Sequence, residues 1–403
     1  MATTVLLSLP SHGHINPTLP LVAELARRGE RVIYYATPPF RAKVEAAGAT
    51  FRSYSADPTF DPSQDLGGPL GLMARSIEWS ETLLPRLLPE IRADQPGYLM
   101  LDTLCVWGNL IQQVLQLPAV TLCSTFALGP KVMGELRRSD APQPPLREFV
   151  AGLPALLQYF RVGRRINRHY GVRTPGLADF FINRQALNLV FTSRDFQPCV
   201  ESFDPSYRFT GPSVAPRTES VDFPLDRLEG RPVVYISLGT IFNNVADFYR
   251  ACFAAFADGP YQVVMSVGAN VADSLLAEAP AGIIVRRYVP QLEILRRSAL
   301  FITHGGMNSV SEALLDGVPV IVVPQVGDQY FVAQRAAALG AGVGLTPAQA
   351  TPERLRALAA QVLGDGSFRA AAGRIGQSLR QAGGYQGAAD EVAAFKQRAG
   401  IAA

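Results

Sequence analysis

The sequence predicts an α/β protein with two Rossmann-like, doubly wound parallel-sheet domains that face each other across a cleft. Strand-like apolar runs alternate with helix-like segments in both halves of the chain, an order typical of parallel sheets covered by helices. The length of 403 residues suits two domains. Residues 211–231 are rich in Pro and charged residues and have no apolar period, which indicates a linker.

The first half opens with a strand followed by a well-marked helix. The helix is predicted from Asn16 to Arg28, with Asn16 as its N-cap, Pro17 at the first helical position and Gly29 as its end. The strands predicted in this half are Thr4–Leu9, Arg31–Ala36, Gly97–Leu101, Ala119–Leu122 and Leu187–Thr192. An N-terminal domain is therefore expected over residues 1–212.

The second half repeats the alternation after a linker at residues 213–230. Its predicted strands are Pro232–Leu238, Tyr261–Ser266, Gly282–Val285, Ala299–Thr303 and Val318–Val323. A C-terminal domain is expected over residues 231–384. The amphipathic pattern of Ala388–Ala399 predicts a helix within the final segment, residues 385–403.

One turn in the second half suits a diphosphate. His304, Gly305 and Gly306 follow an apolar strand, and Asn308-Ser309 then begins a helix, with Ser309 and Glu312 at capping-box spacing. Glycines let the backbone approach an anion, and a helix start offers unpaired N–H groups. His304 can donate to a phosphate oxygen, and Glu312 can accept ribose hydroxyls. The same residues also suit purely structural roles in the turn and the cap.

The flanks of this turn favour a nucleotide sugar. Tyr288 offers an aromatic face for a base and is followed by Pro290-Gln291, while Asp328-Gln329 follows the next strand and suits sugar hydroxyls. Each feature alone is weak, and their order and spacing together carry the prediction.

The first half offers a candidate general base. His14 follows the first strand and Asp102 directly follows the strand Gly97–Leu101. Ligands in such sheets bind beyond the carboxyl ends of the strands, so both side chains are expected at one rim, where a carboxylate can orient the imidazole. The alternatives are that His14 caps the helix entry or lies at the surface and that Asp102 caps the next helix. His12 is a competing candidate that we interpret as structural.

The acceptor side is less defined. Aromatic residues are frequent in residues 54–90 and 123–185, and Trp79, Trp107 and Phe126 are candidates for lining an apolar acceptor pocket. Ordinary core packing explains most such residues individually.

Composition excludes several classes of function. A formal net charge of +3 is too small to indicate nucleic-acid binding. The four Cys residues show no pairing or metal-ligand spacing, the start of the chain does not have the pattern of a signal peptide, and no apolar run reaches membrane-spanning length. A cytoplasmic protein without a membrane span is expected, as a monomer or weak homodimer.

These motifs resemble the nucleotide-sugar glycosyltransferases of the GT-B type, specifically the family-one group with plant natural-product and bacterial macrolide enzymes. The resemblance lies in Tyr288–Gln329 and extends to Ser8–Pro17 and Tyr235–Thr240. Tyr288 stands where Trp is usual, and Met307 stands where plant members have Trp. By motif, the resemblance implies nucleotide-sugar binding by Thr240, Tyr288, Val289, Gln291, His304, Gly306, Met307, Asn308, Ser309, Glu312, Asp328 and Gln329. It also implies that the C-terminal helix at residues 385–403 crosses back to the N-terminal domain.

The resemblance also implies a function. His14 of the G-H-I-N-P segment would be the catalytic base with Asp102 as its partner, in an inverting transfer of a hexose from a UDP-sugar, with UDP-glucose favoured, to a hydroxyl of a hydrophobic macrolide, phenolic or flavonoid. The chain has no D-x-D motif, so a metal-free reaction and no bound cofactor besides the UDP-sugar co-substrate are expected. A dTDP-deoxysugar transferase of antibiotic biosynthesis, a sugar-nucleotide epimerase and a non-catalytic nucleotide-sugar binder are the alternatives.

Overall fold

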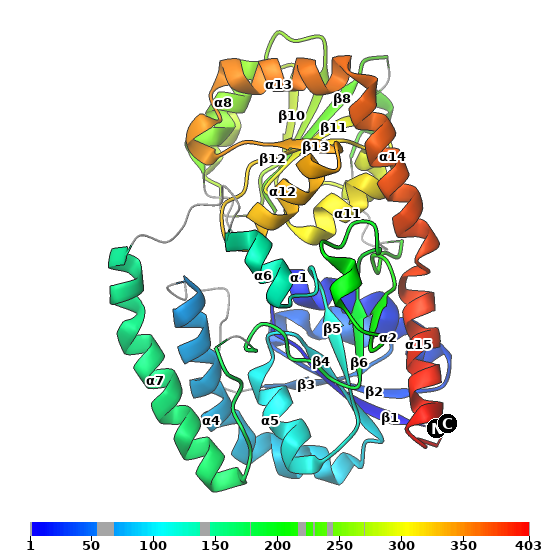
Figure 1. Ribbon diagram of the computed structural model, residues 1–403. Coiled ribbons are helices and arrows are strands. Elements are labelled where there is room, and N and C mark those ends of the chain that lie inside the picture. Colours follow the sequence, from blue (N-terminus) through cyan, green and yellow to red (C-terminus); the bar gives the residue numbers. More distant parts are fainter. Residues whose placement is uncertain are drawn as a thin grey trace. The chain divides into compact units, whose positions relative to one another are not determined.

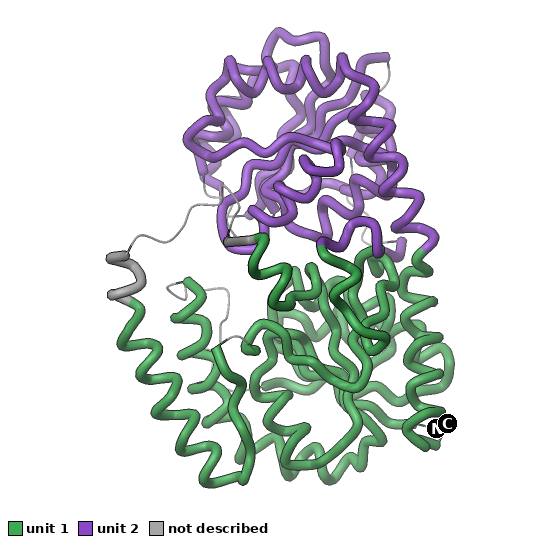
Figure 2. Tube along the Cα trace, in the orientation of Figure 1, with its two compact units in different colours: residues 1–193, 199–213, 382–403 green, residues 194–198, 214–381 purple. Residues whose placement is uncertain are grey.

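The computed structural model describes residues 2–54, 68–137, 146–177, 179–216, 223–228, 230–239, 245–269 and 271–402. Two compact units make up the chain (Figure 2). Unit 1 comprises Met1–Ser193, Cys199–Ser213 and Ala382–Ala403, and unit 2 comprises Arg194–Pro198 and Val214–Gln381. Each unit holds one parallel sheet covered by helices (Figure 1), which confirms the predicted α/β fold class.

Unit 1 is built on a sheet in the order β3-β2-β1-β4-β5-β6-β7, in which every pair is parallel. Its elements are β1 (Thr3–Leu7), α1 (His12–Ile15), α2 (Leu19–Arg27), β2 (Arg31–Ala36), α3 (Arg41–Ala46), β3 (Thr50–Ser53), α4 (Gly68–Asp94), β4 (Tyr98–Asp102), α5 (Val106–Leu115), β5 (Ala119–Cys123), α6 (Pro130–Arg137), α7 (Leu146–Tyr170), β6 (Leu187–Val190), β7 (Tyr207–Phe209) and α15 (Gly384–Arg398).

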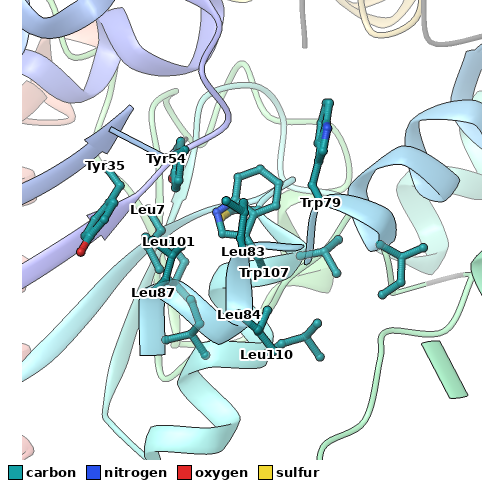
Figure 3. Packing of buried hydrophobic residues seen from close by; sticks show 14 of the residues in the cluster. Leu7, Tyr35, Tyr54, Trp79, Leu83, Leu84, Leu87, Leu101, Trp107 and Leu110 are labelled. Atoms are coloured by element: carbon teal, nitrogen blue, oxygen red, sulfur yellow. The ribbon is translucent and has the colours of Figure 1, made fainter. Parts of the chain in front are cut away.

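Successive strand residues point to opposite sides of this sheet, and the residues on both sides are buried in a core. On β1, Val5 and Leu7 join the core under α4 and α5, whereas Leu6 joins the core that includes α2 and α15. Figure 3 shows the first of these cores, where Leu7 and Leu101 of the sheet gather with Leu83 and Leu87 of α4 and Trp107 of α5.

Unit 2 is built on a parallel sheet in the order β10-β9-β8-β11-β12-β13. Its elements are β8 (Val233–Ser237), α8 (Ala246–Phe256), β9 (Gln262–Ser266), α9 (Asp273–Ala277), β10 (Ile283–Arg286), α10 (Gln291–Leu295), β11 (Ser298–Thr303), α11 (Met307–Leu315), β12 (Val320–Val322), α12 (Gln329–Ala338), β13 (Gly342–Gly344), α13 (Pro352–Gly364) and α14 (Gly366–Gln381). Alternation again divides its core, with Ile236 of β8 on one side and Tyr235 on the other.

Two predicted helix starts are wrong. The first helical turn begins at His12, not after Asn16, because the Ser11 carbonyl already accepts hydrogen bonds from the backbone N–H groups of His14 and Ile15. Asn16 instead begins a short 3-10 turn. In unit 2, Gly306 is the N-cap of α11, so Ser309 and Glu312 lie inside the helix and form no capping box there.

No helix in the described part of the chain is long and apolar enough to cross a membrane. The predicted linker lies partly outside the described residues, at 217–222 and 229, and residues Leu225–Leu228 form a 3-10 turn.

Candidate functional site

His14 and Asp102 are in contact in unit 1. Neighbouring strands β1 and β4 run in parallel with Leu7 opposite Leu101, so the segments that follow them leave from the same edge of the sheet. The Nδ1 atom of His14 lies 2.7 Å from Oδ2 of Asp102. The His14 side chain is 19% exposed and that of Asp102 is 1% exposed, so the pair presents the imidazole to solvent and keeps the carboxylate buried.

Asp102 is held in place by its surroundings. Its Oδ1 accepts a hydrogen bond from the backbone N–H of Leu104 at 2.8 Å, and its backbone carbonyl accepts one from the Asn183 amide at 3.0 Å. With Asp102 ionised, the carboxylate is acceptor-only and Nδ1 of His14 is the donor. The lone pair of the imidazole then lies on Nε2, which is the tautomer that a general base requires.

Two further side chains lie near His14. The Ser124 hydroxyl, at the end of β5, is 3.3 Å from Nδ1 of His14. Sequence reasoning missed both Ser124 and Asn183, because they are ordinary polar residues far away along the chain. His12 is exposed, and its ring meets Phe40 edge-on at 4.9 Å between centroids.

The residues predicted to line an acceptor pocket are buried in unit 1. Trp107 is fully buried and Trp79 is 9% exposed, and their rings meet edge-on within the core on the α4 side of the sheet (Figure 3). Phe126 is 3% exposed. Both Trp rings thus have a packing role, and an acceptor-binding role for the three residues stays a prediction.

In unit 2, His304 occupies a space that two glycines leave open. A Cβ atom at Gly306 would lie 2.5 Å from Nε2 of His304, and one at Gly239 would lie 2.8 Å from its Cε1. Burial lowers the pKa of His304 to about 4, although a hydrogen bond with the Ser237 backbone acts in the opposite direction. The imidazole is therefore neutral near pH 7 and keeps one N–H donor.

The turn before α11 needs its glycine. Gly305 has a φ of +92°, and a Cβ there would lie 2.5 Å from the Val322 side chain. This tight turn brings the first N–H groups of α11 to the carboxyl end of β11, with Met307 buried and Asn308 and Ser309 half-buried. The start of a helix of this length favours an anion.

The structure joins two of the predicted nucleotide-binding residues. The Gln291 amide donates to Oε2 of Glu312 at 2.6 Å, and its carbonyl oxygen accepts from the Tyr235 hydroxyl at 3.0 Å. Glu312 is 3% exposed, whereas Tyr288 is 53% exposed. Val289 is partly buried and packs against a core cluster of unit 2.

Asp328 and Gln329 lie at the start of α12. Asp328 is the exposed N-cap residue. The side-chain carbonyl of Gln329 accepts from the backbone N–H groups of Gln325 at 2.7 Å and Val326 at 3.2 Å, so this oxygen holds the loop. Thr240, the remaining predicted residue, lies outside the described residues.

Comparison with known proteins agrees with these motifs. The family model of the erythromycin biosynthesis protein CIII-like C-terminal domain matches residues 252–389. The NDP-glycosyltransferase YjiC of Bacillus licheniformis is 35% identical over 405 residues, which cover 98% of this chain and 98% of that protein. YojK of Bacillus subtilis, an uncharacterised UDP-glucosyltransferase, is 34% identical over 407 residues, with 99% and 98% covered.

A solved structure is similar over the whole length. CalG4, the calicheamicin glycosyltransferase, matches with a TM-score of 0.82 and 30% identity, and the match covers 99% of each chain. The resemblance predicted from the motifs is confirmed. The chain belongs to the family-one glycosyltransferases of the GT-B fold, with the YjiC and YojK proteins and the macrolide and natural-product glycosyltransferases as relatives.

Proposed function

We propose that this enzyme is an inverting hexosyltransferase that moves a sugar from UDP-glucose or a similar UDP-sugar to a hydroxyl of a hydrophobic natural product. The observation that carries the proposal is the 2.7 Å contact between His14 and a buried, backbone-held Asp102. It is the arrangement that a general base for a hydroxyl needs. One relative named as an NDP-glycosyltransferase and one named as an uncharacterised UDP-glucosyltransferase support the donor class.

The reaction follows from these groups. Nε2 of His14 takes the proton of the acceptor hydroxyl while its oxygen attacks the anomeric carbon and the nucleoside diphosphate leaves. Asp102 stabilises the imidazolium that forms. One displacement inverts the configuration, so an α-linked donor gives a β-glycoside.

The leaving diphosphate gains negative charge in the transition state. The N–H groups at the start of α11 and the neutral His304 are suited to stabilise this charge. We propose that they do so without a metal, because the sequence has no D-x-D motif. The exposed face of Tyr288 would stack on the base, and Asp328 with the amide group of Gln329 would bind sugar hydroxyls.

A dTDP-deoxysugar donor is the second candidate. The demethyllactenocin mycarosyltransferase of Streptomyces fradiae is 29% identical over 405 residues, and oleandomycin glycosyltransferase is 29% identical over 401 residues. Assay of UDP- and dTDP-sugars against mixed phenolic and macrolide acceptors, read by mass spectrometry, separates the two donor classes. It also tests transfer against epimerisation, which would change the donor without an acceptor.

The base is tested by His14→Ala and Asp102→Asn. We expect kcat to fall by about 10²–10⁴-fold in His14→Ala, the usual contribution of a general base, while the affinity for UDP is retained. Asp102→Asn should lower kcat through the wrong tautomer. His12→Ala, a matched change two residues away, should keep most of the activity. Loss of UDP binding with turnover retained in His14→Ala would exclude His14 as the base.

A further inference from the structure

A hydrogen-bonded network in unit 2 links β8, α10 and α11. The Tyr235 hydroxyl is 3.0 Å from Oε1 of Gln291, and Nε2 of Gln291 is 2.6 Å from Oε2 of Glu312. Tyr235 is 1% exposed and Glu312 is 3% exposed. We call these three residues the Tyr235 network.

The direction of the network follows from its two ends. An ionised Glu312 only accepts, so the NH₂ group of Gln291 must face it. The carbonyl of Gln291 then faces Tyr235, whose hydroxyl donates. The Tyr235 hydroxyl satisfies this carbonyl oxygen, so the Gln291 side chain is held at both ends of its amide.

Tyr235 is itself rigidly placed. It lies on β8, which pairs with β9 and β11 in the middle of the sheet. Its ring stacks on Phe301 of β11 with centroids 4.8 Å apart and an interplanar angle of 6°. The hydroxyl therefore has a position set by the sheet rather than by the ligand.

We infer that Tyr235 is a positioning residue that, through Gln291, orients Glu312 and makes the donor site select a ribonucleoside diphosphate over its 2′-deoxy counterpart. This rests on the proposed function and on the role that the sequence predicts for Glu312, which is to accept ribose hydroxyls. A carboxylate held by Gln291 presents its remaining acceptor capacity in one direction, which suits two adjacent hydroxyls. A deoxyribose supplies one donor fewer, and an unmatched buried acceptor weakens binding.

The test uses calorimetric titration of the full-length protein with UDP and with 2′-deoxy-UDP. We expect the wild type to prefer UDP about tenfold, the size of one hydrogen bond to a charged group. Tyr235→Phe should lose most of this preference, because its dissociation constant for UDP rises while that for 2′-deoxy-UDP is unchanged.

The chain offers a matched control in Tyr249. This tyrosine of α8 is fully buried in the same unit, and among the described residues its hydroxyl has no hydrogen-bond partner. Tyr249→Phe removes the same atom and should leave both dissociation constants at their wild-type values. A second variant, Gln291→Met, tests the route: Tyr235→Phe added to it should not weaken UDP binding further.

The remaining outcomes overturn the inference, the proposed function or both. Equal weakening of both nucleotides in Tyr235→Phe would give this residue a merely structural role, and a wild type without preference would remove the selectivity. If neither UDP nor 2′-deoxy-UDP binds, the proposed function is rejected as well. Normal UDP preference in a protein that transfers no sugar would reject the proposed function alone.

Discussion

His304 illustrates at the scale of one residue how packing sets chemistry. Gly239 and Gly306 leave the space that its ring fills, and burial lowers its pKa from 6.5 to about 4. A neutral imidazole can donate one hydrogen bond to a phosphate without bringing a charge of its own. This arrangement lowers the stability of the folded protein in acid, because the imidazole resists protonation in the folded state.

The pH dependence of stability follows from this shift. Between pH 6.5 and 4 the unfolded chain binds a proton at His304 that the folded protein does not, so the free energy of unfolding falls as pH falls through this window. At pH 5 the loss from this residue should be about 1–2 kcal/mol. His304→Gln should reduce the difference in urea-unfolding free energy between pH 7 and pH 5 by this amount. An unchanged difference would show that His304 titrates normally in the folded state.

At the scale of elements, the position of α11 depends on one close contact. Gly376 of α14 packs on the C-terminal end of α11, where a Cβ atom would lie 2.0 Å from the Leu314 carbonyl oxygen. Arg380, one turn further along α14, donates to the carbonyl of Leu315. The start of α11 carries the anion site of the proposed function. The contact with α14 at the other end of α11 therefore helps to fix the position of that site.

Gly376→Ala should therefore destabilise unit 2 by about 1–3 kcal/mol, the usual cost of overpacking, and weaken UDP binding. Gly373→Ala is the control, because it lies on the same helix and no atom in the described part of the chain lies within 4 Å of its added Cβ. That change should be neutral or stabilising by up to about 1 kcal/mol. Urea unfolding followed by circular dichroism, with UDP titration, measures both. Equal effects of the two substitutions would contradict the proposed role of the contact.

Apolar runs predict most of the strands, and the amphipathic pattern of Ala388–Ala399 predicts the last helix, but the full extent of the two longest helices, α4 and α7, is not predicted. The short strands β3, β7 and β13 were missed. In β13, only a glycine fits at position 342 beside β12, because a Cβ there would lie 2.2 Å from the Val320 carbonyl oxygen. In the sequence alone, a Gly-Val-Gly segment does not indicate a strand. The start of α1 was missed because backbone groups of Ser11, rather than a side chain, begin the helix.

The contact between His14 and Asp102 was predictable, because neighbouring parallel strands end at one edge. The hydrogen bond of Tyr235 was not predictable, since along the sequence Tyr235 is one residue of an apolar, buried strand. Its partner Gln291 is brought to it only by the packing of α10 beside the sheet. Contacts of this kind have no signal in spacing.

At the scale of the whole molecule, the last helix belongs to the first unit. Its apolar residues Ala388, Ala389, Val392 and Phe395 join the core that contains Leu6 of β1, and Lys396 pairs with Glu30. The core of unit 1 is therefore complete only after all of unit 2 has been synthesised. Damage to the last helix should unfold the unit that carries His14 and Asp102.

Phe395→Ala tests this dependence. Phe395 is 4% exposed and meets Tyr98 edge-on at 6.1 Å, so truncation should cost about 3–5 kcal/mol. Both tryptophans of the chain lie in unit 1, so their fluorescence during urea unfolding reports on that unit alone, while UDP binding reports on unit 2. We expect the fluorescence transition at a lower urea concentration, with UDP affinity retained in native buffer.

Gln397→Ala, an exposed change on the same helix, is the control and should change neither the fluorescence transition nor the UDP affinity. A fluorescence transition that stays in place in Phe395→Ala would mean that unit 1 folds without its C-terminal helix, and that the helix covers the core without stabilising it.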